Sequence, residues 1–168
     1  MNRVAIVAML MAAGAVFSLA PARADNPPPG ATPAPALAVG DIVPPFEAEG
    51  VDGVRRNFAF EKGSDTVLLF FLSGCPACHK MLPMWNQAFA RRPLSLQVFG
   101  VLLDREPPGF FMATPISFSV VRAPDGDFRR IYKLHRVPMT LRVGPGGVVR
   151  DIGDGPLDAI RLGEIFHP

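Results

Sequence analysis

The chain has 168 residues, 49% of them hydrophobic and 19% charged, a composition that fits one globular domain and excludes a largely disordered protein. Its net charge of +2 falls to zero without the N-terminal residues Arg3 and Arg23, so the remainder lacks the basic excess of a nucleic-acid-binding domain and no nucleic-acid partner is expected. With 2 cysteines, a disulfide-stapled scaffold and a four-thiolate zinc site are both excluded.

Residues 1–24 have the three parts of a secretory signal peptide. Arg3 gives a short positive start, residues 4–20 are apolar, and Ala22-Arg23-Ala24 forms the small-x-small site that a signal peptidase cuts. Cleavage would release the protein into the periplasm, whereas an uncleaved segment would anchor it in the inner membrane facing the periplasm. In both cases the protein reaches an oxidising compartment, in which disulfides persist.

Residues 25–39 are rich in Pro and Ala and predict an extended linker. Eight of the 19 prolines fall between Pro21 and Pro45, and large apolar side chains that could stabilise a fold are scarce there. The folded domain is therefore expected to comprise residues 40–168. A domain of that length can bury a hydrophobic core without covalent staples.

An N-terminal β-hairpin is predicted over residues 46–60. Asp52-Gly53 stands between Val51 and Val54, a pattern typical of a two-residue turn. The next segment, residues 66–72, is an unbroken apolar run without alternation. Such a run predicts a strand buried on both faces of a sheet.

A helix is predicted over residues 75–91, with Leu82, Trp85 and Phe89 on one apolar face that packs in the core. Pro83 is expected to kink this helix without ending it, because the apolar spacing resumes beyond it. The other expected elements are strands over 96–103, 116–121, 139–143 and 148–152, short helices within 104–115 and over 128–134, and a last helix over 157–166. This order predicts an α/β fold with a mixed central sheet and helices on both faces.

The chemistry-bearing residues are Cys75 and Cys78, placed where the buried strand passes into the helix. A helix N-terminus offers unpaired N–H groups and the positive end of the dipole, so it favours the thiolate form of Cys75. Pro76 fits the first helical position. Cys78 comes round to the same side three residues later, where it can attack a mixed disulfide formed at Cys75. The pattern predicts a redox pair that needs no bound cofactor.

Two other interpretations of the cysteine pair exist. A static disulfide closing four residues would restrict the unfolded chain little, by about 2 kcal/mol. A zinc site would need two further ligands, and the three histidines are scattered along the chain.

With a strand ending in Cys-x-x-Cys at a helix start, residues 39–166 resemble the thioredoxin family. Pro83 matches the kinking proline of that family's first helix, and residues 134–140 resemble the loop that carries its cis-proline. The Gly-rich hairpin that ends in residues 148–153 is also similar. Val39-Gly40-Asp41 with Pro44-Pro45-Phe46 resembles the TlpA/ResA/DsbE-type branch, and residues 72–78 resemble the thioredoxin-like protein of methylamine utilisation.

The resemblance implies a periplasmic thiol–disulfide oxidoreductase whose partners are secreted thiol or disulfide proteins, for instance in cytochrome c maturation. A reductive role would also need a membrane electron donor. Pro138 would be the cis-proline and would expose the Val137 backbone to an extended substrate segment. Pro76, Ala77 and His79 would tune the redox pair, because they lie within or directly after it.

Two departures from the family stand out. Gly74 replaces the tryptophan that usually precedes the first cysteine, so one substrate-contacting aromatic group is missing. The buried acidic residue that relatives use as a proton acceptor has no counterpart, because Leu69 and Met81 occupy the two expected places. Water or His79 would then carry the proton. Phe110-Phe111-Met112 is expected to pack in the core; the alternative is an apolar patch that faces the substrate.

Two rival functions remain open. A copper-binding protein similar to the Sco type would use Cys75 and Cys78 with His135 or His79, since soft thiolates suit Cu(I). A peroxiredoxin would need a threonine three residues before its catalytic cysteine, and Leu72 stands there.

Overall fold

The computed structural model describes residues 36–60, 63–124 and 126–167. The predicted signal peptide 1–24 and most of the predicted linker 25–39 lie outside these residues, so both remain predictions. The described residues all belong to one compact unit. None of the helices in the described part of the chain is long and apolar enough to span a membrane.

A mixed sheet forms the centre of this unit, as predicted. Its strands are β1 (Phe46–Gly50), β2 (Arg55–Phe58), β3 (Thr66–Phe71), β4 (Gln97–Leu102), β5 (Ser119–Arg122), β6 (Met139–Val143) and β7 (Val149–Asp154). They follow the order β2-β1-β5-β4-β3-β6-β7. The apolar strand β3 is buried along its whole length and pairs parallel with β4 and antiparallel with β6. An apolar strand therefore occupies an inner place with neighbours on both edges.

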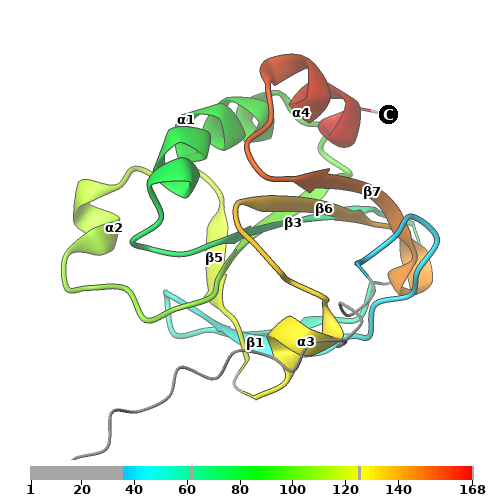
Figure 1. Ribbon diagram of the computed structural model, residues 1–168, viewed down its shortest axis with the longest axis horizontal. Coiled ribbons are helices and arrows are strands. Elements are labelled where there is room, and N and C mark those ends of the chain that lie inside the picture. Colours follow the sequence, from blue (N-terminus) through cyan, green and yellow to red (C-terminus); the bar gives the residue numbers. More distant parts are fainter. Residues whose placement is uncertain (1–35, 61–62, 125, 168) are drawn as a thin grey trace, which may run out of the picture. The chain divides into compact units, whose positions relative to one another are not determined.

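Helices cover both faces of the sheet. They are α1 (Pro76–Arg91), α2 (Phe110–Ala113), α3 (Phe128–Ile131) and α4 (Ala159–Phe166). Helices α1 and α4 lie together on one face and α3 lies on the other (Figure 1). Each face has its own apolar cluster: Trp85 and Leu82 of α1 pack in the first, and Phe128 of α3 packs in the second. The α/β prediction with two covered faces is confirmed.

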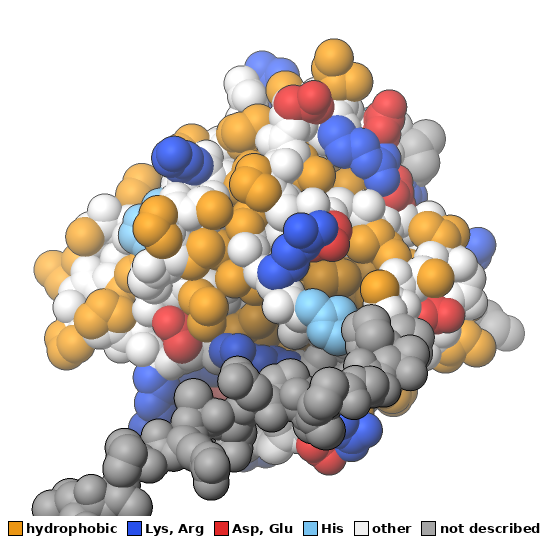
Figure 2. Space-filling view, viewed as in Figure 1, with side chains coloured by type: hydrophobic (Ala, Val, Ile, Leu, Met, Phe, Trp, Pro, Cys, Tyr) orange, Lys and Arg blue, Asp and Glu red, His pale blue; other side chains and the backbone are white. Residues whose placement is uncertain are grey.

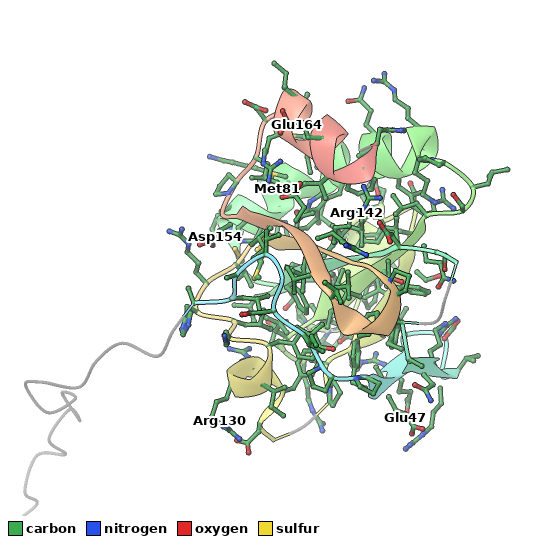
Figure 3. All side chains as sticks on the ribbon, turned by 90° about the vertical axis from the view of Figure 1, so that its right-hand side faces the viewer. Glu47, Met81, Arg130, Arg142, Asp154 and Glu164 are labelled. Atoms are coloured by element: carbon green, nitrogen blue, oxygen red, sulfur yellow. The ribbon has the colours of Figure 1, made fainter. Side chains whose placement is uncertain are left out.

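Polar contacts join helices to strands on the α1 side of the sheet. The Trp85 indole N–H donates to the Thr140 hydroxyl of β6 over 3.1 Å. Arg142 of β6 reaches beneath α4 (Figure 3), where it donates to the Ile165 carbonyl over 3.0 Å and pairs with Asp65. Residues far apart in the sequence thus fix both helices against the sheet.

The N-terminal hairpin is present, but its predicted two-residue turn is wrong. The Gly50 N–H donates to the Val54 carbonyl over 2.8 Å, which leaves three residues, 51–53, in the loop. Gly53 has φ 76°, so the left-handed conformation falls on the last loop residue. A turn followed by a left-handed glycine is the usual three-residue hairpin connection, and it uses the same Asp-Gly pair.

Helix α1 runs through Pro83 as predicted, whereas several other elements differ from their predicted bounds. Strand β5 begins at Ser119 instead of residue 116, because the Ser117 N–H donates to the Asn86 side chain of α1 and not to a neighbouring strand. Helix α3 is one turn long and ends before Lys133, which has φ 49°. Strand β7 continues to Asp154, paired with Met139.

Candidate active site

Cys75 is the N-cap residue of α1. Its backbone is extended, and its sulfur accepts a hydrogen bond from the Cys78 N–H over 3.2 Å. Pro76 occupies the first helical position, where it has no N–H to leave unpaired. Both cysteines are free thiols, with Cys75 half-buried and Cys78 buried. The more accessible sulfur is thus the one that receives an N–H group at the helix start, which stabilises its anionic form.

A short loop carries the chain from β3 to this cap. Strand β3 ends at Phe71, and the Cys75 N–H donates back to the Leu72 carbonyl over 3.3 Å. The helix begins at once, since the His79 N–H donates to the Cys75 carbonyl over 3.0 Å. The apolar strand and the proline-started helix therefore fix the place of the sulfur from both sides.

Burial keeps the Cys78 sulfur in its protonated form. Burial raises the pKa of the Cys78 thiol to about 12, and the side-chain hydrogen bond between the two cysteines raises it further. Cys78 is 0% exposed and lies in the same apolar cluster as Met81 and Trp85. Cys78 is therefore a poor first nucleophile, which leaves the attack on a partner to Cys75.

The two expected places of a proton acceptor are apolar in the folded chain. Leu69 and Met81 are buried beside Cys78 in one cluster. Met81 lies between α1 and the segment leading to α4 (Figure 3), and its sulfur accepts the Leu157 N–H over 3.3 Å. Among the described residues, neither place supplies a carboxylate to take the Cys78 proton.

The Val137–Pro138 peptide bond is cis, as the resemblance implied. Met139 pairs with Phe70 of β3, so Pro138 and Val137 continue alongside the end of β3, next to the loop that leads to Cys75. Val137 and Cys75 both pack against the first apolar cluster. Within the described residues the Val137 N–H and carbonyl have no backbone partner, so both remain free for an added strand.

The structure separates the three histidines. His79 is close to the cysteine pair and contacts the Ser73 carbonyl through Nε2 over 2.6 Å. His135 is exposed in the loop before β6, and His167 follows α4. In the described part of the chain, no three His, Cys, Asp or Glu side chains gather closely enough to hold a metal ion, so the copper alternative has no assembled ligand set.

The expected core packing of residues 110–112 is only partly correct. Phe110 is buried, with its ring edge-on to His79 at 6.0 Å, and Phe111 is half-buried, but Met112 is 93% exposed. A single-turn helix such as α2 can bury only one side, which leaves Met112 in solvent. Hydrophobic side chains gather on the surface over α2 in the space-filling view (Figure 2).

Two site residues escaped the sequence analysis. Ser73 is buried just before the cysteine pair, and both its N–H and its hydroxyl donate to Asp104 over 2.9 Å. Asp104 follows β4, 31 positions along the chain. The contact between Ser73 and Asp104 could have been predicted only from parallel pairing of β3 and β4, because that pairing brings the residues after both strands to one edge of the sheet.

No family model matches the chain. Curated proteins do: the thiol-disulfide oxidoreductase ResA of Oceanobacillus iheyensis is 25% identical over 132 residues, which are 74% of this chain and 69% of that protein. The sporulation thiol-disulfide oxidoreductase A of Bacillus subtilis is 26% identical over 110 residues, 61% of this chain and 67% of that one.

Solved structures show a similar fold. A putative thiol:disulfide interchange protein DsbE from Chlorobium tepidum superposes with a TM-score of 0.65 at 28% identity, covering 75% of this chain and 92% of that one. StoA from Bacillus subtilis superposes with a TM-score of 0.64 at 23% identity, covering 73% and 96%.

A mixed sheet with a Cys-x-x-Cys pair at the start of α1 and a cis-proline before β6 defines a thioredoxin-like protein. Within that class, the chain is a thiol–disulfide oxidoreductase that is similar to the ResA and DsbE proteins.

Proposed function

We propose that this chain exchanges disulfides with secreted proteins through Cys75 and Cys78. The observation that carries the proposal is the Cys75 sulfur at the α1 N-terminus, 3.2 Å from the Cys78 N–H and with both thiols free. An accessible thiolate beside a buried thiol is the arrangement that thiol–disulfide exchange requires.

The exchange proceeds in two steps that conserve electrons. The Cys75 thiolate attacks one sulfur of a partner disulfide, which forms a mixed disulfide and releases the partner's other sulfur as a thiolate that takes up a proton. Cys78 then loses its proton and attacks the Cys75 sulfur, which closes the Cys75–Cys78 disulfide and releases the partner's second thiolate. The partner gains two electrons and the cysteine pair loses them; the reverse sequence oxidises a dithiol partner.

The partner segment binds as an extended strand beside Val137. The free N–H and carbonyl of Val137, held next to cis-Pro138, supply main-chain hydrogen bonds that do not depend on the partner's sequence. Pro76 and Ala77 tune the reduction potential of the cysteine pair because they begin the helix with small side chains between the two sulfurs. His79 tunes it from the first turn of α1.

The setting is extracytoplasmic. The predicted signal peptide 1–24 would export the domain 40–168 on its linker 25–39, to the periplasm or to the outer side of the inner membrane. Proteins of similar fold include a secreted disulfide oxidoreductase of Mycobacterium tuberculosis and an exposed thioredoxin lipoprotein of Streptococcus pneumoniae.

We favour reduction of secreted cysteine pairs, including those of cytochrome c precursors, with electrons from a membrane donor. The reduction potential of the Cys75–Cys78 pair decides the direction: a value of about −270 mV would indicate a reductant, and a value of about −120 mV would indicate an oxidant.

Cys78→Ser is the variant that tests this function. Without the second thiol the mixed disulfide at Cys75 cannot resolve, so partners stay covalently bound. We expect affinity purification of the exported variant to recover secreted, cysteine-containing proteins that reductant releases. The matched control is the double variant Cys75→Ser/Cys78→Ser, which should retain none of them. Equal recovery from both variants, or none from either, would contradict the proposal.

A further inference from the structure

Ser73 is held through all of its polar groups by two residues from other elements. Its N–H donates to Asp104 over 2.9 Å and its hydroxyl donates to the second Asp104 oxygen over 2.9 Å. Its carbonyl lies 2.6 Å from His79 Nε2. Ser73 is buried and stands two residues before Cys75. The side chains of Asp104 and His79 thus fix the segment that leads to the reactive sulfur.

The carboxylate of Asp104 serves this single contact. Asp104 lines a polar groove of about 890 Å³ together with Arg122 and Arg129. Within the described part of the chain it forms no ion pair with them: Arg122 pairs with Glu106, and Arg129 donates to the Leu103 carbonyl over 2.7 Å. Both Asp104 oxygens face Ser73 instead. A carboxylate that accepts two hydrogen bonds from one residue fixes both the position and the orientation of that residue.

His79 contacts the one remaining polar group of Ser73, its carbonyl. A carbonyl oxygen only accepts hydrogen bonds, so His79 Nε2 carries the proton and donates it to Ser73. His79 lies in the first turn of α1, so this bond ties the helix start back to the loop that precedes it. Cys75 lies between the two anchored positions, 73 and 79.

We propose that Asp104 and His79 are positioning residues that hold the Ser73–Cys75 loop so that the Cys75 sulfur stays on the α1 N-terminus. This inference rests on the proposed function, because it assigns the two residues a role in the reactivity of the same thiol. When the loop loosens, the sulfur leaves the Cys78 N–H and its thiolate loses stabilisation. Less thiolate means slower attack, and a less stable reduced form gives a more negative reduction potential.

The direction in which the Cys75 alkylation rate changes when Asp104 is replaced distinguishes a positioning role from a purely electrostatic one. Removing the negative Asp104 carboxylate would, by Coulomb interaction alone, favour the Cys75 thiolate and speed its alkylation. Loss of positioning acts in the opposite direction. In a Cys78→Ala background, we expect Asp104→Ala to slow alkylation of Cys75 by iodoacetamide at pH 7 by about tenfold, the size of one lost helix cap.

Three variants serve as controls and keep the test decisive if Asp104→Ala folds poorly. Asp104→Asn keeps one acceptor oxygen and should restore most of the rate, and Ser73→Ala should slow alkylation by only a few-fold. Glu106→Gln removes a similar charge from the same loop without touching Ser73 and should leave the rate unchanged. For His79, His79→Ala should slow the reaction, and His79→Gln, which keeps an N–H donor, should recover part of it.

Alkylation profiles against pH, together with reduction potentials measured with both cysteines present, provide the readout. We expect the profile of Asp104→Ala to move to higher pH and its potential to become more negative. A faster or unchanged reaction in Asp104→Ala would overturn the inference even if disulfide exchange with partners is found. Slower alkylation in a protein that exchanges no disulfides would instead overturn the proposed function alone.

Discussion

Replacing Cys75 by serine is expected to slow disulfide exchange by at least about a thousandfold, because a serine hydroxyl neither ionises near neutral pH nor forms a disulfide. Cys78 cannot take over as the first nucleophile, since its sulfur is buried and its pKa is raised to about 12. The measurement is a single-turnover reaction of the reduced protein with a disulfide-bonded model peptide, followed by mass spectrometry.

Cys78→Ser is the matched control for this reaction. It keeps the nucleophile, so it should form the mixed disulfide at close to the native rate and then stop. Both serine variants change one sulfur to oxygen within the same helix turn, and circular dichroism would show that both remain folded. Exchange that persists in Cys75→Ser but disappears in Cys78→Ser would reverse the assigned roles of the two cysteines.

The second large effect concerns the pH dependence of the resolving step. Below the pKa of a thiol, its ionised fraction rises tenfold for each pH unit, and burial raises the pKa of Cys78 to about 12. The Cys75 contribution to this shift disappears once Cys75 is in a mixed disulfide, while burial, the largest cause, remains. We therefore expect release of glutathione from a Cys75–glutathione mixed disulfide to accelerate about tenfold per unit between roughly pH 6 and 9.

A rate of glutathione release that stays flat above neutral pH would contradict this prediction, because it would mean that a nearby base already removes the Cys78 proton. The environment of Met81 allows a further check. Met81→Glu places a carboxylate one helical turn from Cys78 and should speed release at neutral pH and flatten the profile. Met81→Gln introduces a buried polar group of equal size without a base, so it should keep the steep dependence.

The sequence predicted the parts of this protein that depend on local chemistry. The apolar run of β3, the cysteine pair after it and Pro76 are adjacent in the chain, and together they define a buried strand that passes into a helix. The cis bond before Pro138 was predicted through family resemblance alone, since nothing in Val137-Pro138 by itself distinguishes it from an ordinary proline before a strand.

Contacts between distant segments could not be predicted in the same way. Asp104 follows a strand as many loop aspartates do, and only the parallel register of β3 and β4 brings it to Ser73. The start of β5 was misplaced because Ser117 bonds to Asn86 of α1, which no local pattern encodes. Met112 was expected in the core because its neighbours are apolar, yet a one-turn helix can bury only one side.

The alkylation rate of Cys75 in the fully reduced protein, measured from about pH 5 to 9 with mass spectrometry to identify the modified sulfur, tests the central claim most directly. A thiolate favoured by the α1 N-terminus predicts that modification falls on Cys75 and that Cys75 reacts faster at neutral pH than a cysteine in an unfolded peptide. A Cys75 rate no faster than that of a cysteine in an unfolded peptide, or modification that falls on Cys78, would contradict the account.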